Sequence, residues 1–404
     1  MARFKLLLPV YLPTLLLSLG QGVLLPTLPI YAAKSLGVSF ALVSVAIGAS
    51  AVGTLVADLP SGVILERVGR RPAMLFGAGS VAVSCLLVPF IQTFPALVVL
   101  QFIGGVGTAA WGISRHVFLV DSTRPEQRGQ AISMFGGINR IGTFGGPAIG
   151  GIIADQFGLA WPFLFSGILA AVAVVISYFF IPESKPRGAT VTTGAYLRAL
   201  GTVVVENRRV LSTAGIAQLC TQMIRAGRQV IVPLYGAYSL NLGVAAIGQV
   251  ISISSAIDMV LFIPAGILMD RIGRKAAIIP CFIILSIGMA MVPLSRDYAT
   301  LLVATTIMGF GNGIGSGTMM TLGADLAPAA SVGSFLGVWR LIGDVGGAGG
   351  PVVVGTIADL IGLAASAYAL AGIGILSVIL FAFAVPETNQ RPRRGNAVIP
   401  LPPE

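Results

Sequence analysis

Residues 66–71 read ERVGRR, and residues 270–275, 204 positions further along the chain, read DRIGRK. Each hexapeptide directly follows a long apolar run and joins an acid to a glycine and a basic cluster. The same offset of 204 aligns identical residues along most of the sequence, including Pro29 with Pro233, Pro60 with Pro264, Gly105 with Gly309, Asp121 with Asp325, Pro147 with Pro351 and Asp155 with Asp359. An offset of about half the chain length predicts an internal duplication.

The composition places both halves in a membrane. Of the 404 residues, 55% are hydrophobic and 10% are charged, whereas soluble domains are about 25% charged. A soluble fold is therefore excluded, and the three cysteines show no disulfide or zinc pattern. We predict an all-α integral membrane protein with twelve transmembrane helices in two six-helix parallel repeats. The twelve runs long enough for the roughly 20 residues needed to cross a bilayer are 6–33, 40–65, 72–93, 95–120, 129–156, 160–182, 209–239, 243–269, 275–295, 298–325, 332–358 and 364–386.

The one long polar connection lies in the middle of the chain. We predict a six-helix bundle at 1–182, a linker at 183–208, a second bundle at 209–386 and a tail at 387–404. With six spans in each half, 18 of the 25 basic residues fall on the side of the termini. This bias predicts that the linker, the tail and both termini are cytoplasmic, and it explains the net charge of +10 without nucleic acid. We expect a monomeric, multi-pass protein of the plasma or inner membrane whose partners are lipid and a small-molecule substrate.

Two parallel six-span repeats, each with a basic loop after its second span, resemble the major facilitator superfamily over essentially the whole chain. The resemblance implies that the halves rock around a site between them. It also implies a loop that locks the outward-facing state by pairing with span 11 and with an acid that ends span 4. The gating-loop residues that the resemblance assigns are Gly62, Glu66, Arg67, Gly69, Arg70, Arg71 and Asp121 in the first copy, and Gly266, Asp270, Arg271, Gly273, Arg274, Lys275 and Asp325 in the second.

A glycine-rich motif on the fifth span, GTFGGPAIGG at residues 142–151, is similar to one that marks the proton-coupled exporters of the superfamily. Ordinary close packing of helices through glycine also explains it, just as a purely topogenic role explains the basic loops. The sequence departs from the drug exporters at Gln101, where many of them have a basic residue. The proton-relay arginine of those exporters is therefore not assigned to any residue of this chain. The motif residues are Gly142, Gly146, Pro147, Gly150 and Gly151.

Ionisable residues inside the spans are candidates for proton coupling, because charges in a bilayer are costly and usually functional. A rise of 1.5 Å per residue allows Asp58 and Arg115 to pair within the first half, either as a proton site or as a permanent ion pair. Arg140 and Asp344 occupy equivalent positions of the two repeats, so they can bridge the halves or face the cavity separately. Arg340 is a competing partner for Asp344, one turn away on the same helix. The proton-coupling candidates are Asp58, Arg115, Asp258 and Asp344.

A second set of candidates concerns the substrate. Arg225 and Arg228 lie three residues apart on one face of span 7, which the resemblance places along the cavity. Such a pair suits a carboxylate, phosphate or sulfate group, unless the two side chains snorkel toward the membrane interface. The substrate-cavity candidates are Gln21, Arg140, Arg225, Arg228 and Arg340.

Other function classes lack their sequence signals. No phosphate-cradling loop supports an ATP-driven pump, and no cluster of cysteine, histidine and carboxylate residues supports a metal site or an enzyme. We expect a secondary transporter that needs no cofactor and uses the proton gradient to export amphipathic organic compounds. An importer or exchanger of organic anions that uses the intramembrane arginines stays open, as does a receptor or a lipid scramblase.

Overall fold

The computed structural model describes residues 7–123, 128–182, 193–329 and 331–388, in which all regular secondary structure is helical. The first helices are α2 (Leu12–Ser35), α3 (Phe40–Val68), α4 (Arg70–Leu87), α5 (Phe94–Asp121), α6 (Arg128–Phe157) and α7 (Trp161–Phe180). They are followed by α8 (Thr193–Glu206), α9 (Arg208–Val210), α10 (Ile216–Leu234), α11 (Val244–Arg271), α12 (Arg274–Met291), α13 (Tyr298–Ile314), α14 (Thr318–Leu326), α15 (Val332–Leu360) and α16 (Leu363–Ile379). Short π or 3-10 segments are η1 (Leu7–Tyr11), η2 (Val88–Phe90), η4 (Leu211–Gly215), η5 (Tyr235–Ser239), η6 (Val292–Leu294) and η7 (Leu380–Ala384).

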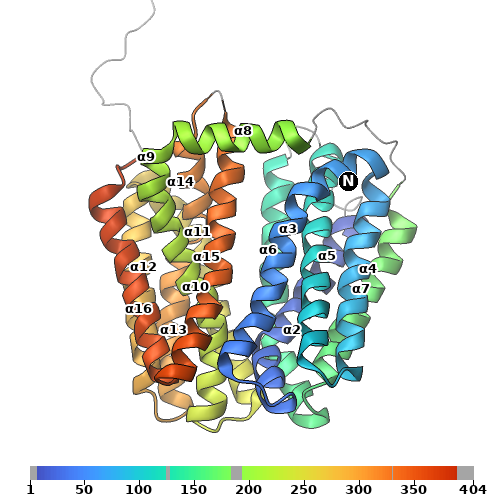
Figure 1. Ribbon diagram of the computed structural model, residues 1–404, viewed down its shortest axis with the longest axis vertical. Helices are drawn as coiled ribbons and strands as arrows, with labels where there is room; N and C mark the ends of the chain where they lie inside the picture. Colours follow the sequence, from blue (N-terminus) through green and yellow to red (C-terminus); the bar gives the residue numbers. More distant parts are fainter. Residues whose placement is uncertain (1–6, 124–127, 183–192, 330, 389–404) are drawn as a thin grey trace, which may run out of the picture.

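The helices form two groups that stand side by side (Figure 1). We call α2–α7 the N-terminal bundle and α10–α16 the C-terminal bundle. Helix α8 lies across one end of the molecule, which we call the linker end; the opposite end is the far end. The bundles touch where α6 packs against α11 and where α15 packs against α3.

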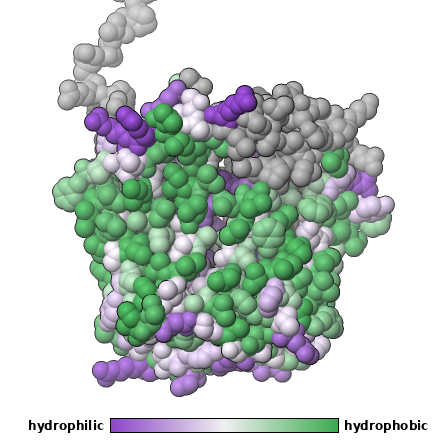
Figure 2. All heavy atoms as spheres, in the orientation of Figure 1, coloured by the Kyte–Doolittle hydropathy of each residue, from purple (hydrophilic) through white to green (hydrophobic). Residues whose placement is uncertain are grey.

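The surface has the pattern of a membrane protein. Figure 2 shows a broad hydrophobic band, with hydrophilic side chains gathered toward the ends of the molecule. Within the described residues, nine helices are long and apolar enough to cross a membrane. The other three predicted spans coincide with α6, with α10 and its flanking turns, and with α13 together with α14. The predicted all-α membrane class is therefore confirmed, while the count of twelve spans and the repeat organisation stay predictions.

The glycine-rich motif of the fifth span packs α6 against two neighbours. A Cβ atom added to Gly142 or Gly146 would lie 2.7 Å from backbone atoms of α2, and one added to Gly151 would lie 2.9 Å from Ala245 of α11. On α15, a Cβ at Gly350 would likewise lie 2.8 Å from the backbone of α10. These contacts agree with the close-packing interpretation, since small residues let backbones approach. Any further role of the motif stays a prediction.

The predicted span 298–325 is not one continuous helix, which corrects the sequence-based expectation. Helix α13 ends at Ile314 and α14 begins at Thr318, and Gly317 between them has a φ of 78°. This left-handed conformation is open to glycine at little cost. Earlier in the same run, Gly311 and Gly313 do pack tightly against α12 and α11. In the glycine run at residues 309–317, the alternate glycines from Gly309 to Gly315 are thus packing positions, and Gly317 breaks the helix.

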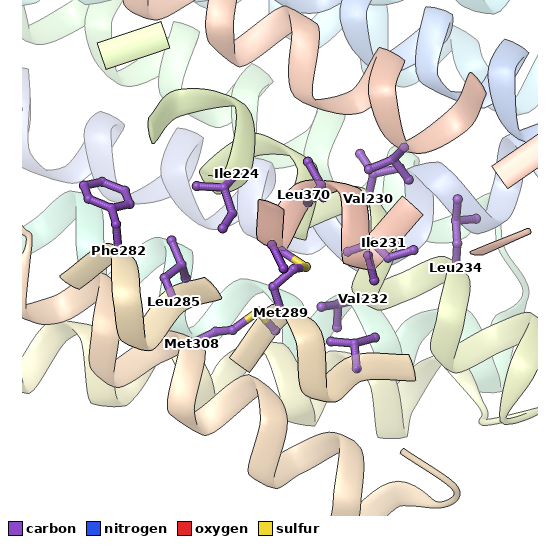
Figure 3. Packing of buried hydrophobic residues seen from close by; sticks show 14 of the residues in the cluster. Ile224, Val230, Ile231, Val232, Leu234, Phe282, Leu285, Met289, Met308 and Leu370 are labelled. Carbon is purple, nitrogen blue, oxygen red and sulfur yellow. The ribbon is translucent and has the colours of Figure 1, made fainter. Parts of the chain in front are cut away.

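Apolar packing holds each bundle together internally. In the C-terminal bundle, side chains of α10, α12, α13 and α16 meet in one buried cluster (Figure 3), which includes Ile224, Phe282, Leu285, Met308 and Leu370. All five are at most 1% exposed. This interior positions α10 so that another of its faces is directed toward the N-terminal bundle.

Candidate functional site

Two adjoining cavities lie between the bundles. The first has a volume of about 470 Å³ and is lined by apolar side chains and four glutamines; we call it the glutamine cavity. The second has a volume of about 350 Å³ and is lined by three arginines and one aspartate; we call it the arginine cavity. Leu25, Gln222 and Gln229 line both. Because both bundles supply lining residues, any movement of one bundle against the other changes both cavities.

Most of the predicted candidates that lie inside the spans reach these cavities. Asp58, Arg115 and Arg340 are not among the described lining residues of either cavity. The candidates that line a cavity are Gln21 and Asp344 in the glutamine cavity, and Arg140, Arg225, Arg228 and Asp258 in the arginine cavity.

An ion pair in the arginine cavity joins the bundles. Nη1 of Arg140 on α6 lies 3.4 Å from Oδ1 of Asp258 on α11, and Nη2 donates a hydrogen bond to Oγ of Ser316 at 3.1 Å. The amide of Asn312 donates to Oδ2 of Asp258 at 2.9 Å. The direct bridge between Arg140 and Asp344 is not formed, because α6 packs against α11 whereas α15 packs against α3.

The break between α13 and α14 supplies polar groups that bond to lining residues of this cavity. The carbonyl oxygen of Gly315 accepts a hydrogen bond from Nη2 of Arg225 at 3.0 Å. The hydroxyl of Ser316 donates to Oδ1 of Asp258 at 3.2 Å. A continuous helix would have used the Gly315 carbonyl for its own ladder. The helix break therefore supplies an acceptor that holds Arg225 in place.

Asp58 also pairs across the bundles. Its Oδ2 atom lies 2.9 Å from Nη2 of Arg340 on α15, and Nε of Arg340 lies 3.8 Å from Oδ2 of Asp344 on the same helix. The expected pair of Asp58 with Arg115 is therefore not formed. The guanidinium of Arg115 lies instead 3.9 Å from the centre of the Phe135 ring.

Helix periodicity explains why Asp58 faces α15. Phe40 at the start of α3 donates its backbone N–H to Asp359 of α15 at 2.9 Å. Asp58 follows 18 residues later, which is five turns of 3.6 residues, so it lies on the same face of α3 as Phe40. That face is covered by α15 rather than by α5.

The two interbundle ion pairs are staggered by one helical turn. The differences 258 minus 58 and 340 minus 140 are both 200, whereas the predicted repeat has an offset of 204. Relative to the repeat, the acid and the base of the second pair are each shifted by four residues, about one turn. Because both shift in the same direction, they still lie at the same depth and can pair. The Arg140–Asp258 pair consequently lies about one turn further from the linker end than the Asp58–Arg340 pair does.

At the far end, two carboxylates bond to the opposite bundle. Asp155 of α6 accepts hydrogen bonds from the backbone N–H groups of residues 244–245 at 2.9 and 3.0 Å. Asp359 of α15 accepts them from residues 40–41, both at 2.9 Å. Each carboxylate thus satisfies free N–H groups in the first turn of a helix, where the helix dipole favours an anion. Both the acids and the amides recur 204 residues apart.

At the linker end, the gating-loop residues pair inside each bundle. Nη2 of Arg70 lies 2.9 Å from Oδ2 of Asp121, and Nε of Arg274 lies 2.8 Å from Oδ2 of Asp325. Arg274 also pairs with Asp270, one turn earlier on α11, at 3.1 Å. The two copies of the loop therefore make the same arginine–aspartate contact.

Further contacts of the two loops recur as well. Arg71 donates to the carbonyl oxygen of Tyr178 at 2.8 Å, and Lys275 donates to that of Ala382 at 3.0 Å, again 204 residues later. The glycines that precede α4 and α12 have φ angles of 95° and 146°, which other residues rarely adopt. Of Gly62, Glu66 and Arg67 the structure describes only the helical backbone, and a Cβ at Gly266 would meet no described atom within 4 Å. Arg271 is exposed at the end of α11, and the locking role of the loop stays a prediction.

Apart from Gln21, the uncharged polar residues of the site were not predicted from the sequence. The lining includes amides at Gln101, Gln222, Gln229 and Asn312, and the ion pair in the arginine cavity includes the Ser316 hydroxyl. An available signal was the presence of amide side chains inside apolar runs, because a buried amide without a partner is costly.

The helical architecture and the interbundle site agree with a comparison to known families. Residues 10–219 and 214–402 each match the Major Facilitator Superfamily. The chain belongs to this superfamily. It is therefore a multi-pass membrane transporter of small molecules and not an enzyme, as the sequence predicted.

Individual proteins are similar at lower identity. The chain is 26% identical over 357 residues to an MFS-type transporter of Methanocaldococcus jannaschii, covering 88% of this chain and 92% of the relative. It is 25% identical over 282 residues to the class H tetracycline resistance protein of Pasteurella multocida, covering 68% and 69%. Among solved structures, the nucleoside transporter NupG superposes with a TM-score of 0.79 at 14% identity, over 95% of this chain and all of that one. The structural likeness establishes the fold alone.

Proposed function

We propose that this major facilitator protein is a secondary active transporter that exports amphipathic organic compounds in exchange for protons. The observation that carries the proposal is the pair of adjoining cavities between the bundles, which combine apolar walls with a few polar and charged groups. Sites for small organic molecules have this composition. The similarity to a tetracycline resistance protein over about two thirds of each chain supports export.

The proposed architecture is a pair of six-helix repeats in the plasma or inner membrane. It comprises bundles at 1–182 and 209–386, a linker at 183–208 and a tail at 387–404, with the linker end in the cytoplasm. The recurrence of the far-end and linker-end contacts at an offset of 204 supports the repeat, and the basic residues of the linker side support the orientation. The far-end contacts then correspond to a state that is closed to the outside. We propose that a monomer suffices, because both cavities are built from one chain.

Proton coupling is assigned to Asp58 and Asp258. Each carboxylate forms an ion pair with an arginine of the other bundle. Protonation removes the carboxylate charge and with it the attraction between the bundles, so proton binding and bundle separation are linked. Oδ1 of Asp58 is buried and has no hydrogen-bonding partner within the described part of the chain, which leaves one oxygen open to a proton.

The coupling assignment is tested in inverted membrane vesicles that carry a pH-sensitive dye. In vesicles containing the native protein, addition of ethidium or of an anionic dye is expected to release protons from the acid-loaded lumen. Asp58→Asn and Asp258→Asn should abolish this release, while the matched far-end variant Asp297→Asn should retain it. Proton release at native rates in both Asp58→Asn and Asp258→Asn would exclude these carboxylates from coupling.

A second candidate function, import or exchange of organic anions, is favoured by one specific observation. Among the described residues that line the arginine cavity, three are arginines and one is an aspartate. The two functions differ in the dependence on protons: an anion exchanger would move substrate in the absence of a pH gradient when a second anion is present on the opposite side.

A further inference from the structure

The arginine cavity carries more positive charge than its own residues neutralise. Arg140 is paired with Asp258, and the described lining residues include no further carboxylate for Arg225 and Arg228. Asp258 has little capacity left, since Oδ1 accepts from Ser316 as well as from Arg140, and Oδ2 accepts from Asn312. The cavity is therefore left with an excess of two positive charges.

The two surplus guanidinium groups also have unused donors. Nε of Arg225 and Nη1 of Arg228 are buried and have no hydrogen-bonding partner among the residues that the structure describes. Nη2 of Arg225 bonds to the Gly315 carbonyl, and the guanidinium carbon lies 5.1 Å from the centre of the Phe282 ring. A buried polar group without a partner is unfavourable by about 1–3 kcal/mol, and more when it is charged. An anion placed between these arginines would satisfy both the charge and the donors.

The adjoining glutamine cavity has a different chemistry. Its lining includes apolar side chains such as Leu24, Leu28 and Ile47, and its only charged lining residue within the described chain is Asp344. Gln222 and Gln229 of α10 line both cavities. They stand in the same helix as the two arginines, so one ligand can contact the arginines with one end and the glutamine cavity with the other.

From this arrangement we propose that the two cavities together bind one amphipathic organic anion. Its carboxylate, sulfonate or phosphate group binds Arg225 and Arg228. The rest of the ligand, which is apolar and can accept hydrogen bonds from glutamine amides, occupies the glutamine cavity. Arginine is suited to this role, because its planar donors match oxyanions in a bidentate geometry. The inference rests on the proposed transport function and narrows its substrates to anions.

The test uses two fluorophores that differ in charge but share an aromatic body. Dansylglycine carries a carboxylate, whereas dansylamide is neutral, and the emission of both rises in an apolar site. With the purified native protein in detergent, dansylglycine is expected to bind at least tenfold more tightly than dansylamide. Equal affinity of the two probes, or no binding of dansylglycine, would overturn the proposal without any variant.

Substitutions then separate the two ends of the ligand. Arg228→Gln and Arg225→Gln should each weaken dansylglycine binding at least tenfold and leave dansylamide unchanged, whereas Arg296→Gln in an exposed far-end loop should affect neither probe. Ala51→Phe narrows the glutamine cavity and should weaken both probes alike. Native dansylglycine affinity in both cavity-arginine variants would refute the anion site.

Binding in detergent requires no gradient, so it is independent of coupling. If dansylglycine binds as expected but releases no protons from vesicles, the anion site holds and the proposed proton exchange fails. If ethidium drives proton release while dansylglycine does not bind, the export function holds and the anion site fails.

Discussion

The far end and the linker end both carry aspartates that accept hydrogen bonds from neighbouring groups, but the partners differ. At the far end, Asp155 and Asp359 make four backbone hydrogen bonds that all cross between the bundles. At the linker end, Asp121 and Asp325 pair with arginines of their own bundle. Opening of the far end must therefore break these four bonds, whereas the described linker-end pairs can persist when the bundles move apart.

The largest effect is expected from a steric block of the far-end interface. A Cβ at Gly355 of α15 would lie 2.8 Å from Cβ of Ser44 on α3, so Gly355→Leu should prevent closure of the far end and lower transport in proteoliposomes more than tenfold. Gly333→Leu lies on the same helix, where an added Cβ meets no atom within 4 Å, and it should transport normally. Equal transport by both variants would contradict the idea that the far end must close.

Removal of both crossing carboxylates should have the next largest effect. Loss of a helix cap costs about 1 kcal/mol, so Asp155→Ala combined with Asp359→Ala should shift the closed far end toward the open state by about 2 kcal/mol, or roughly 30-fold. Hydrogen exchange measured by mass spectrometry should accelerate in peptides that contain residues 40–41 and 244–245.

The chain offers a matched control for this variant. Asp297 accepts hydrogen bonds from Thr300 of its own bundle, and these bonds hold the pKa of the Asp297 carboxyl below its usual value. Asp297→Ala should therefore accelerate exchange only at the start of α13. Faster exchange of residues 40–41 in Asp297→Ala would show that loss of any helix cap at the far end opens it, and not specifically loss of the caps that connect the two bundles.

A smaller effect is expected at the linker end. Arg274 pairs with both Asp325 and Asp270, so Arg274→Gln should lower the Tm of the purified protein by about 2–4 °C. Because these bonds stay within one bundle, exchange of the far-end peptides should remain at the native rate. An acceleration of exchange in residues 244–245 would contradict the independence of the two ends.

The smallest effect concerns a single neutral bond between the bundles. The backbone N–H of Ala148 on α6 donates to Oγ of Ser252 on α11 at 2.9 Å. Ser252→Ala should weaken the closed state by about 1 kcal/mol, seen as a severalfold faster exchange around residues 244–245. Ser255→Ala removes a bond inside α11 and should leave that exchange unchanged.

Sequence reasoning identified most groups of the site but few of their partners. Positions such as Arg225 and Asp258 stand out because charge is rare in apolar runs, and Asp155 and Asp359 stand out through the offset of 204. Their partners depend on which helices of the two bundles touch, and hydrophobic runs carry no such information because the bilayer imposes apolarity on every side. The five-turn spacing of Phe40 and Asp58 is present in the sequence, but only the packing of α15 on α3 shows which helix the shared face contacts.

The helix break at residues 315–317 could not be read from the pattern for a different reason. Glycine serves both close helix packing and left-handed backbone, and the run contains both uses within nine residues. Only the left-handed backbone of Gly317 shows where the helix breaks.

The one-turn stagger of the two interbundle ion pairs has an electrical consequence. One turn is about 5.4 Å, or roughly a fifth of the hydrocarbon thickness of a bilayer. A proton held at Asp258 instead of Asp58 has therefore crossed about a fifth more of the membrane voltage. At 100 mV this corresponds to about 0.4 kcal/mol, so a transfer between the two carboxylates would move charge through the field and make occupancy of the pairs sensitive to voltage.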